Sequence, residues 1–155
     1  MNPDDKQPAI DYQALAELRY QIRRFLRFSE QAARSARLEP QQYQLLLALK
    51  GLPEGKKPTI GELAERLQIQ HNSTVELINR LVEHNLVARQ RDEADQRYVI
   101  ITLTTHGEEI LQQLAFYHQT ELQSIGPALL HTLETILMHS SDPQDSLANS
   151  QEDKG

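Results

Sequence analysis

The part of this chain that most constrains its fold is residues 59–103, where two signals for a helix start precede two strand-like runs. Thr59 and Glu62 have the spacing of a capping box, in which each side chain satisfies a backbone N–H group at the beginning of a helix. Ser73 and Glu76 repeat this spacing. The segment therefore predicts two short consecutive helices, the first beginning at Thr59 or just after it and the second at Ser73.

Apolar side chains recur at helical spacing in both segments, which predicts the faces that the helices bury. In the first helix these residues are Ile60, Leu63, Ala64 and Leu67, and in the second they are Val75, Ile78, Leu81 and Val82. The residues predicted on or near the opposite side of the second helix are Thr74, Leu77, Arg80 and His84.

A β-hairpin is predicted directly after the second helix. The β-branched run 99–102 predicts a strand that pairs back on residues 87–89 across a charged tip. The tip interleaves Arg89, Arg91 and Arg97 with Asp92, Glu93 and Asp95. A helix pair that leads into a hairpin is the layout of a winged helix-turn-helix, which places one helix in the DNA major groove. Taken alone, the tip is explained equally well as a charged, solvated loop.

Further helices are predicted before this segment. Residues 10–37 carry apolar side chains at helical spacing. A second helix starts at Glu39-Pro40, because proline is tolerated in the first turn and disfavours helix in the residue before it, and it ends at Gly51.

The hairpin is followed by another helix, which a third capping box at Thr105 and Glu108 opens. We expect it to reach about residue 124, to be broken by Gly126-Pro127, and to be followed by a last helix that continues to residue 139.

These elements predict a mainly α (α+β) chain: a winged helix-turn-helix over residues 38–103, with helical segments 10–37 and 104–139 on either side. Residues 1–9 and 140–155 are polar, contain prolines and charges, and are expected to be disordered.

The composition is compatible with this fold. The chain has 155 residues, enough for one domain of ordinary size, and no cysteine, which removes disulfides and thiol chemistry. Sixteen basic residues face twenty-two acidic ones, but residues 1–58 carry ten Lys/Arg against seven Asp/Glu, whereas residues 98–155 carry one against eight. Affinity for phosphate depends on the electrostatic field at the surface that contacts DNA. The overall acidic charge lowers non-specific binding without preventing specific binding, so it favours a selective DNA binder over a general one. Without a membrane span or a secretory leader, we expect a cytoplasmic protein.

The start of the second helix carries short polar side chains suited to nucleic acid. They are His71, Asn72, Ser73 and Thr74. Asn can read adenine, Ser and Thr contact bases or phosphate, and helix N-terminal N–H groups grip phosphate. A merely well-capped helix start explains the same residues. Arg80, one turn further along, would reach a phosphate or simply be solvated.

At these residues the chain resembles the MarR family of winged helix-turn-helix regulators, over about residues 10–139. The resemblance rests on TIGELAERL, on NSTVELINRLVEHNLV, and on RDEADQR followed by ITLTTHGEEIL. The family commonly shows Asp-x-x-Asp-x-Arg in the wing, then Leu-Thr and a Gly that opens the next helix. The matching residues are Asp92, Asp95, Arg97, Leu103, Thr104 and Gly107.

The resemblance implies that Arg97 enters the minor groove, that Asp95 orients it, and that residues 71–74 contact the major groove. Arg91 and Gln96 complete the DNA-binding set that we expect. Gln96 departs from the family, in which a second arginine is common at this position.

A homodimer built from the terminal helices is also implied, and exposed apolar residues support it. The expected contributors are Leu15, Leu18, Ile22, Leu111, Leu114, Leu122, Ile125, Leu129, Leu133, Ile136 and Leu137. Two-fold symmetry would set two recognition helices about one DNA turn apart and predict a pseudo-palindromic operator. Packing within one chain is the alternative.

The family also implies a small-molecule effector. Tyr20, Arg23, Arg27 and Tyr43 are the residues that would line a pocket for an anionic aromatic compound. An arginine stripe on a helix is more often a solvated or interface face.

Enzyme and metal functions find little support. There is no Gly-rich phosphate loop, nucleophile elbow or acid–base carboxylate pair, so we expect no catalysis and no cofactor. His118 with Glu121, and His131 with Glu134, have helical spacing for half a zinc site but no third ligand, so we expect no metal. The sequence thus predicts a DNA-binding regulator that acts as a repressor. The alternative is a winged helix that docks another protein.

Overall fold

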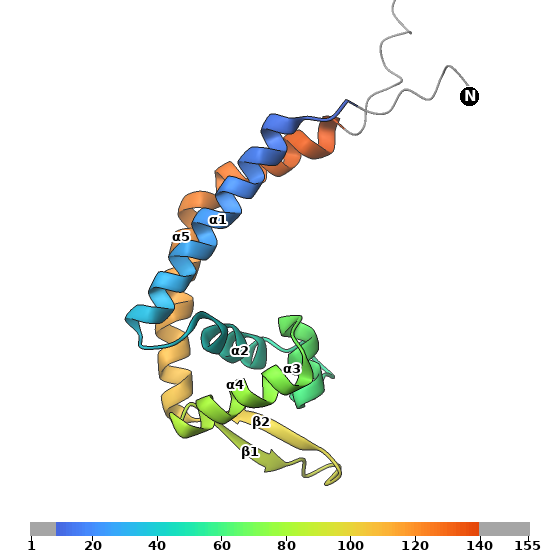
Figure 1. Ribbon diagram of the computed structural model, residues 1–155, viewed down its shortest axis with the longest axis vertical. Helices are drawn as coiled ribbons and strands as arrows, with labels where there is room; N and C mark the ends of the chain where they lie inside the picture. The colour runs from blue at the N-terminus through green and yellow to red at the C-terminus, as the bar shows by residue number, and fades with distance from the viewer. Residues whose placement is uncertain (1–8, 140–155) are drawn as a thin grey trace, which may run out of the picture. The chain divides into compact units, whose positions relative to one another are not determined.

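The computed structural model describes residues 9–139, which form a mainly helical chain with one small antiparallel sheet, as the sequence predicts (Figure 1). The elements are α1 (Tyr12–Ser35), α2 (Pro40–Lys50), α3 (Ile60–Leu67), α4 (His71–Glu83), β1 (Val87–Arg91), β2 (Val99–Leu103) and α5 (Thr105–His139). The disorder expected for residues 1–8 and 140–155 lies outside the described residues.

The chain divides into two compact units, and α1 and α5 run through both. The winged unit is Arg27–Thr120, and the terminal-helix unit contains the described residues 9–26 and 121–139. The winged unit is larger than the predicted segment 38–103 because the second half of α1 and the first half of α5 belong to its core.

The core of the winged unit joins every one of its elements. Its fully buried side chains are Tyr43, Leu45, Leu46, Leu63, Thr74, Ile78, Leu81, Leu86, Val87 and Ile101. Ala33 from α1 and Leu111 and Leu114 from α5 belong to the same cluster. Leu111 and Leu114 are 4% and 3% exposed within a single chain, so the prediction that they lie in a dimer interface is wrong.

Two of the predicted helix starts are confirmed. The Thr59 hydroxyl accepts a hydrogen bond from the Glu62 backbone N–H at 3.2 Å, and α3 begins at the next residue. At α2, Pro40 occupies the first turn, and Glu39 and Gln42 form a reciprocal capping box.

The predicted start of α4 at Ser73 is wrong. The helix begins at His71 and is preceded by Gln70, which has extended backbone and no side-chain cap. The short turn from α3, with Gln68 in the left-handed region at φ 54°, fixes this start. Tertiary packing decides the boundary here, and Ser73 lies exposed within the first helical turn.

The buried face of α4 shares only Ile78 and Leu81 with the predicted face. Thr74, Leu77, Ile78 and Leu81 are buried. Val75 is half-buried, and Val82, predicted in the core, is 36% exposed.

Two details of α5 also differ from expectation. The N-cap of α5 is Thr104 and not Thr105, because the Thr104 hydroxyl accepts a hydrogen bond from the Gly107 N–H at 3.0 Å. The helix also continues through Pro127, where a break is predicted. A proline removes one helical hydrogen bond, and because Pro127 and Gln123 are exposed, water can satisfy the carbonyl left free.

The hairpin has the predicted pairing, with Val87 opposite Leu103 and Arg89 opposite Ile101. The loop before α3 runs along the other edge of β2, where the Ile101 N–H donates to the Pro58 carbonyl at 2.9 Å and Thr59 bridges to Ile100. Both edges of β2 are therefore partly paired, which fixes the hairpin against the helices of the winged unit.

Candidate nucleic-acid interface

The first turn of α4 presents polar side chains to solvent. His71, Asn72 and Ser73 are all exposed, next to the N–H groups that a helix leaves free at its start. Thr74 is different: its side chain is fully buried, and its hydroxyl donates to the Gln70 carbonyl at 3.0 Å. The predicted base contact by Thr74 is therefore corrected to a structural role, because this residue lies on the same buried face of α4 as Leu77 and Ile78.

Arg80, further along α4, is exposed and lies 3.3 Å from the Glu39 carboxylate. Such surface ion pairs contribute at most about 1 kcal/mol. A phosphate could therefore replace Glu39 as the partner of Arg80 at little cost. The neighbouring Asn79 accepts a hydrogen bond from Arg89 of β1, which ties the hairpin to α4.

Arg97 stands at the tip of the wing, the β1–β2 hairpin with its turn. Its guanidinium forms a forked contact with Asp95, with Nε to Oδ1 at 2.9 Å and Nη2 to Oδ2 at 2.6 Å. The side chain of Arg97 is nevertheless 84% exposed, so its remaining donors face solvent. The predicted contact between Asp95 and Arg97 is confirmed.

The fork is itself held by the turn. The Asp95 carboxylate also accepts the Arg97 backbone N–H at 3.1 Å, and the Asp95 carbonyl accepts the Tyr98 N–H at 3.1 Å. The pKa of the Asp95 carboxyl lies below its ordinary value, first because the Arg97 side chain bonds to it and second because the Arg97 backbone does. The carboxylate therefore remains charged at neutral pH and keeps the arginine oriented.

Arg91 and Gln96, the other predicted wing residues, meet within the turn. The Arg91 guanidinium donates to the Gln96 carbonyl at 3.1 Å, and both residues are exposed. Arg91 thus stabilises the turn backbone as well as adding positive charge.

Sequence reasoning missed the contact between the wing and Lys57. Lys57, from the loop before α3, lies 2.5 Å from the Asp92 carboxylate and has its Nζ 5.2 Å from the centre of the Tyr98 ring. The pKa of Asp92 is lowered, chiefly by its hydrogen bond to Lys57, and the pKa of Lys57 is raised by the same bond. The two residues are 35 positions apart, and no local pattern in the sequence joins them.

Of the four predicted effector-binding residues, three are exposed and one is buried. Tyr20, Arg23 and Arg27 are exposed, with Tyr20 stacked under Arg24 at 5.7 Å. Tyr43 is 1% exposed and its ring stacks on His118 at 4.5 Å. Burial raises the pKa of Tyr43. The prediction that Tyr43 lines an accessible pocket is corrected: it is a core residue of the winged unit.

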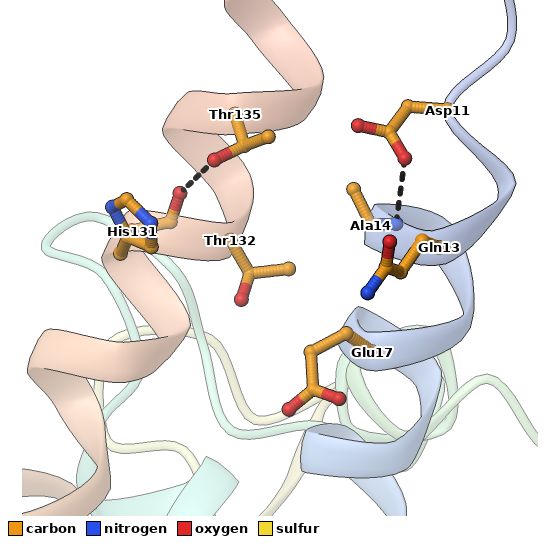
Figure 2. A pocket seen from close by; sticks show the side chains of 7 residues that line it. All are labelled: Asp11, Gln13, Ala14, Glu17, His131, Thr132 and Thr135. Carbon is orange, nitrogen blue, oxygen red and sulfur yellow. Dashed lines mark hydrogen bonds between the residues drawn. The ribbon is translucent and has the colours of Figure 1, made fainter.

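Each unit contains cavities. One cavity of about 310 Å³ lies in the terminal-helix unit, and Figure 2 shows residues that line it, among them Asp11 and Glu17 at one side and His131 and Thr132 of α5 at the other. The winged unit has one of about 530 Å³ whose lining includes Phe28, Gln113 and Tyr117, with no Lys or Arg. None of the predicted effector residues lines either cavity.

Neither helical His/Glu pair forms a metal site. His118 is buried, with its ring nitrogens 2.6 Å from the Leu114 carbonyl and 2.7 Å from the Ser29 hydroxyl. Within residues 9–139, no group of three or more His, Asp or Glu side chains is placed to hold a metal ion. No helix in this same range is long and apolar enough to cross a membrane.

The helix pair α3–α4 and the adjoining wing define a winged helix-turn-helix protein. Residues 38–97, within the winged unit, match the model of the MarR family.

Among curated relatives, the chain is 37% identical over 67 residues to the uncharacterized HTH-type transcriptional regulator YsmB of Bacillus subtilis. This match covers 43% of the chain and 46% of the relative, so the chain spans about half of that relative's length.

Solved structures show the same fold over more of the chain. MepR, a transcription regulator of the Staphylococcus aureus multidrug efflux pump MepA, matches with a TM-score of 0.68 at 19% identity, covering 83% of this chain and 98% of that one. BpsR of Bordetella bronchiseptica, whose DNA binding is regulated by 6-hydroxynicotinic acid, matches with a TM-score of 0.59 at 25% identity, covering 84% and 99%.

Proposed function

We propose that this chain is a sequence-specific DNA-binding transcriptional regulator, acting in the cytoplasm as a repressor. The observation that carries the proposal is the arginine fork at the wing tip: Arg97 is largely exposed and is oriented by Asp95. An arginine presented in this way suits the narrow minor groove, where the negative potential is enhanced. The exposed His71, Asn72 and Ser73 on α4 supply the major-groove contacts.

The match of residues 38–97 to the MarR family model supports this function, as do the relatives. YsmB is named as a transcriptional regulator, and BpsR is a DNA-binding protein. The role is one of binding, and no step of it requires a cofactor or catalysis.

The proposal includes a homodimer. Both helical segments of the terminal-helix unit expose large apolar side chains, among them Tyr12 at 74%, Leu130 at 61% and Leu137 at 67%. Contiguous exposed apolar surface favours association, and a two-fold dimer would bring two recognition helices to a pseudo-palindromic operator. Of the predicted interface residues, Leu15, Ile22, Leu122 and Leu133 are also exposed.

A small aromatic effector is a further part of the proposal, supported by the 6-hydroxynicotinic acid that regulates BpsR. The cavity beside Phe28 and Tyr117 has a volume suited to such a compound. Its lining carries no positive charge, so it suits a neutral aromatic better than an anion. Titration of the protein–DNA complex with a set of neutral phenols, and with 6-hydroxynicotinic acid and phenolic acids as anionic compounds, tests this part. Operator affinity unchanged by every compound would count against it.

The competing function is a winged helix that docks another protein, and replacement of Arg97 separates the two. A labelled duplex, chosen by selection of bound sequences from a random pool, is titrated with the wild type and with Arg97→Ala in fluorescence anisotropy. We expect Arg97→Ala to weaken binding by about 1–3 kcal/mol, the cost of losing a specific groove contact. Arg34→Ala, on the exposed side of α1, removes the same charge and should have little effect. Equal affinity of wild type and Arg97→Ala would refute the wing assignment.

A further inference from the structure

Three ties hold the wing to other elements of the winged unit. At its base, Arg89 of β1 bonds to Asn79 of α4. Along β2, the Ile101 N–H bonds to the Pro58 carbonyl. At the turn, the ammonium of Lys57 bonds to Asp92. The first two hydrogen bonds hold the strands of the wing. The third, between Lys57 and Asp92, holds the turn that carries Arg97.

Asp92 connects Lys57 to the backbone of the turn. One of its carboxylate oxygens binds Lys57, the other accepts the Ala94 N–H at 3.1 Å, and its own backbone N–H donates to the Tyr98 carbonyl at 3.0 Å. Its side chain is only 14% exposed. Asp92 therefore joins both ends of the turn to one another and to the lysine.

Tyr98 adds a second contact on the same lysine, since the Nζ of Lys57 lies over its ring. Tyr98 directly follows Arg97 in the chain, and its N–H is bonded to Asp95. Movement of Lys57 away from Asp92 and Tyr98 would thus free the turn in which the arginine fork is built.

The geometry points to Lys57 as a positioning residue for DNA binding: it holds the wing turn to the loop before α3, so that Arg97 is presented at a fixed place relative to α4. The inference rests on the proposed function, because the benefit of a fixed Arg97 is operator affinity. Ordering a segment before binding reduces the entropy lost on binding.

The chain offers a matched control in the adjacent residue. Lys56 has nearly the same exposure, 54% of its side chain against 46% for Lys57, but its partner is Glu62 of α3, at 3.8 Å. Lys56→Met and Lys57→Met remove the same charge from the same loop. Only Lys57→Met removes a contact with the wing turn.

The test compares these variants with Lys57→Arg in anisotropy titrations on the selected duplex. We expect Lys57→Met to weaken binding about fivefold, the cost of ordering one or two side chains on binding. Lys57→Arg should restore near wild-type affinity, since a guanidinium can pair with a carboxylate and stack on a ring. Lys56→Met should change affinity by less than about twofold, as expected for a screened surface charge.

A double-variant comparison distinguishes positioning from direct phosphate contact. If Lys57 acts through Arg97, Lys57→Met has no further effect once Arg97 is replaced by alanine. A loss that persists in the Arg97→Ala background, or a loss equal to that of Lys56→Met, overturns the inference.

Backbone ¹⁵N relaxation of residues 93–97 in the DNA-free protein provides the readout that does not depend on DNA. Lys57→Met should lower the order parameters of these amides, and Lys56→Met should not. Unchanged order parameters in Lys57→Met overturn the inference. If the wild type binds no duplex, the proposed function fails, and the relaxation data alone decide whether Lys57 holds the turn.

Discussion

Replacement of Gly107 by alanine tests how tightly the wing is joined to α5. A Cβ at this position would lie 2.0 Å from the Leu86 carbonyl oxygen and 2.9 Å from its carbon. Both are backbone atoms of a residue that is 1% exposed, so no flexible side chain can move aside. The same carbonyl also accepts the Thr104 N–H at 3.1 Å. Relief of the clash must therefore displace the beginning of the hairpin.

The expected magnitude follows from two opposing effects. Glycine to alanine within a helix normally stabilises by up to about 1 kcal/mol. Overpacking costs typically about 1–3 kcal/mol, and a contact of 2.0 Å with a backbone oxygen belongs at the upper end of that range. Gly107→Ala should therefore lower the free energy of unfolding by about 2 kcal/mol.

Urea denaturation, followed by far-UV circular dichroism at one fixed protein concentration, measures this difference. Gly61→Ala is the matched control, because Gly61 lies in the first turn of α3 and a Cβ there meets no atom within 4 Å. The control should be neutral or more stable by about 0.5 kcal/mol. If Gly107→Ala is as stable as Gly61→Ala, the close approach of α5 to Leu86 is wrong.

Three further predictions concern the helix caps, α4 and the wing. Thr59→Ala should cost about 1 kcal/mol of stability, whereas Ser73→Ala, which removes no cap, should cost much less in the same urea titration; equal losses would contradict the assigned helix starts. Asn72→Ala should weaken operator binding by about 1–3 kcal/mol in anisotropy, while Thr74→Val, at a buried site, should act on stability and leave the affinity of the folded protein nearly unchanged. The pKa of Asp92 lies below its ordinary value of 3.8, so its contribution to the stability of the turn should be fully present above pH 3.8 and should be lost only as the pH falls through the lowered pKa. Amide relaxation of the turn that changes between pH 7 and 5 would refute this.

Local signals in the sequence predicted those parts of the fold in which neighbouring residues decide the structure. Thr59 caps α3 through its own hydroxyl, and the pairing of the hairpin follows from its β-branched run. The contact of Asp95 with Arg97 was predictable for the same reason, since the two are two residues apart.

Boundaries decided by packing were not predictable in this way. The capping pattern predicts that α4 starts at Ser73, but the short turn from α3 sets the start at His71. Packing also decides which face of α4 is buried: Thr74 enters the core, whereas Val82 is 36% exposed. The candidate DNA-binding surface therefore loses Thr74 and keeps its three neighbours at positions 71–73.

Contacts between residues that lie far apart in the sequence could not be predicted from local patterns either. Lys57 and Asp92 approach only because the loop before α3 runs beside β2. Tyr43 carries the residue type of a ligand contact, but its stacking on His118 is a tertiary contact. At Pro127, the expected break assumes that proline ends a helix, whereas exposure of the site permits its continuation.

Selection of bound fragments from the source genome tests the central claim most directly. The full-length protein is incubated with sheared genomic DNA, and the retained fragments are sequenced. We expect enrichment of a pseudo-palindromic motif whose half-sites are centred about 10 base pairs apart, as two recognition helices of a two-fold dimer require, and we expect Arg97→Ala to lose most of that enrichment. Recovery of the genome without any enriched sequence would contradict a sequence-specific regulator.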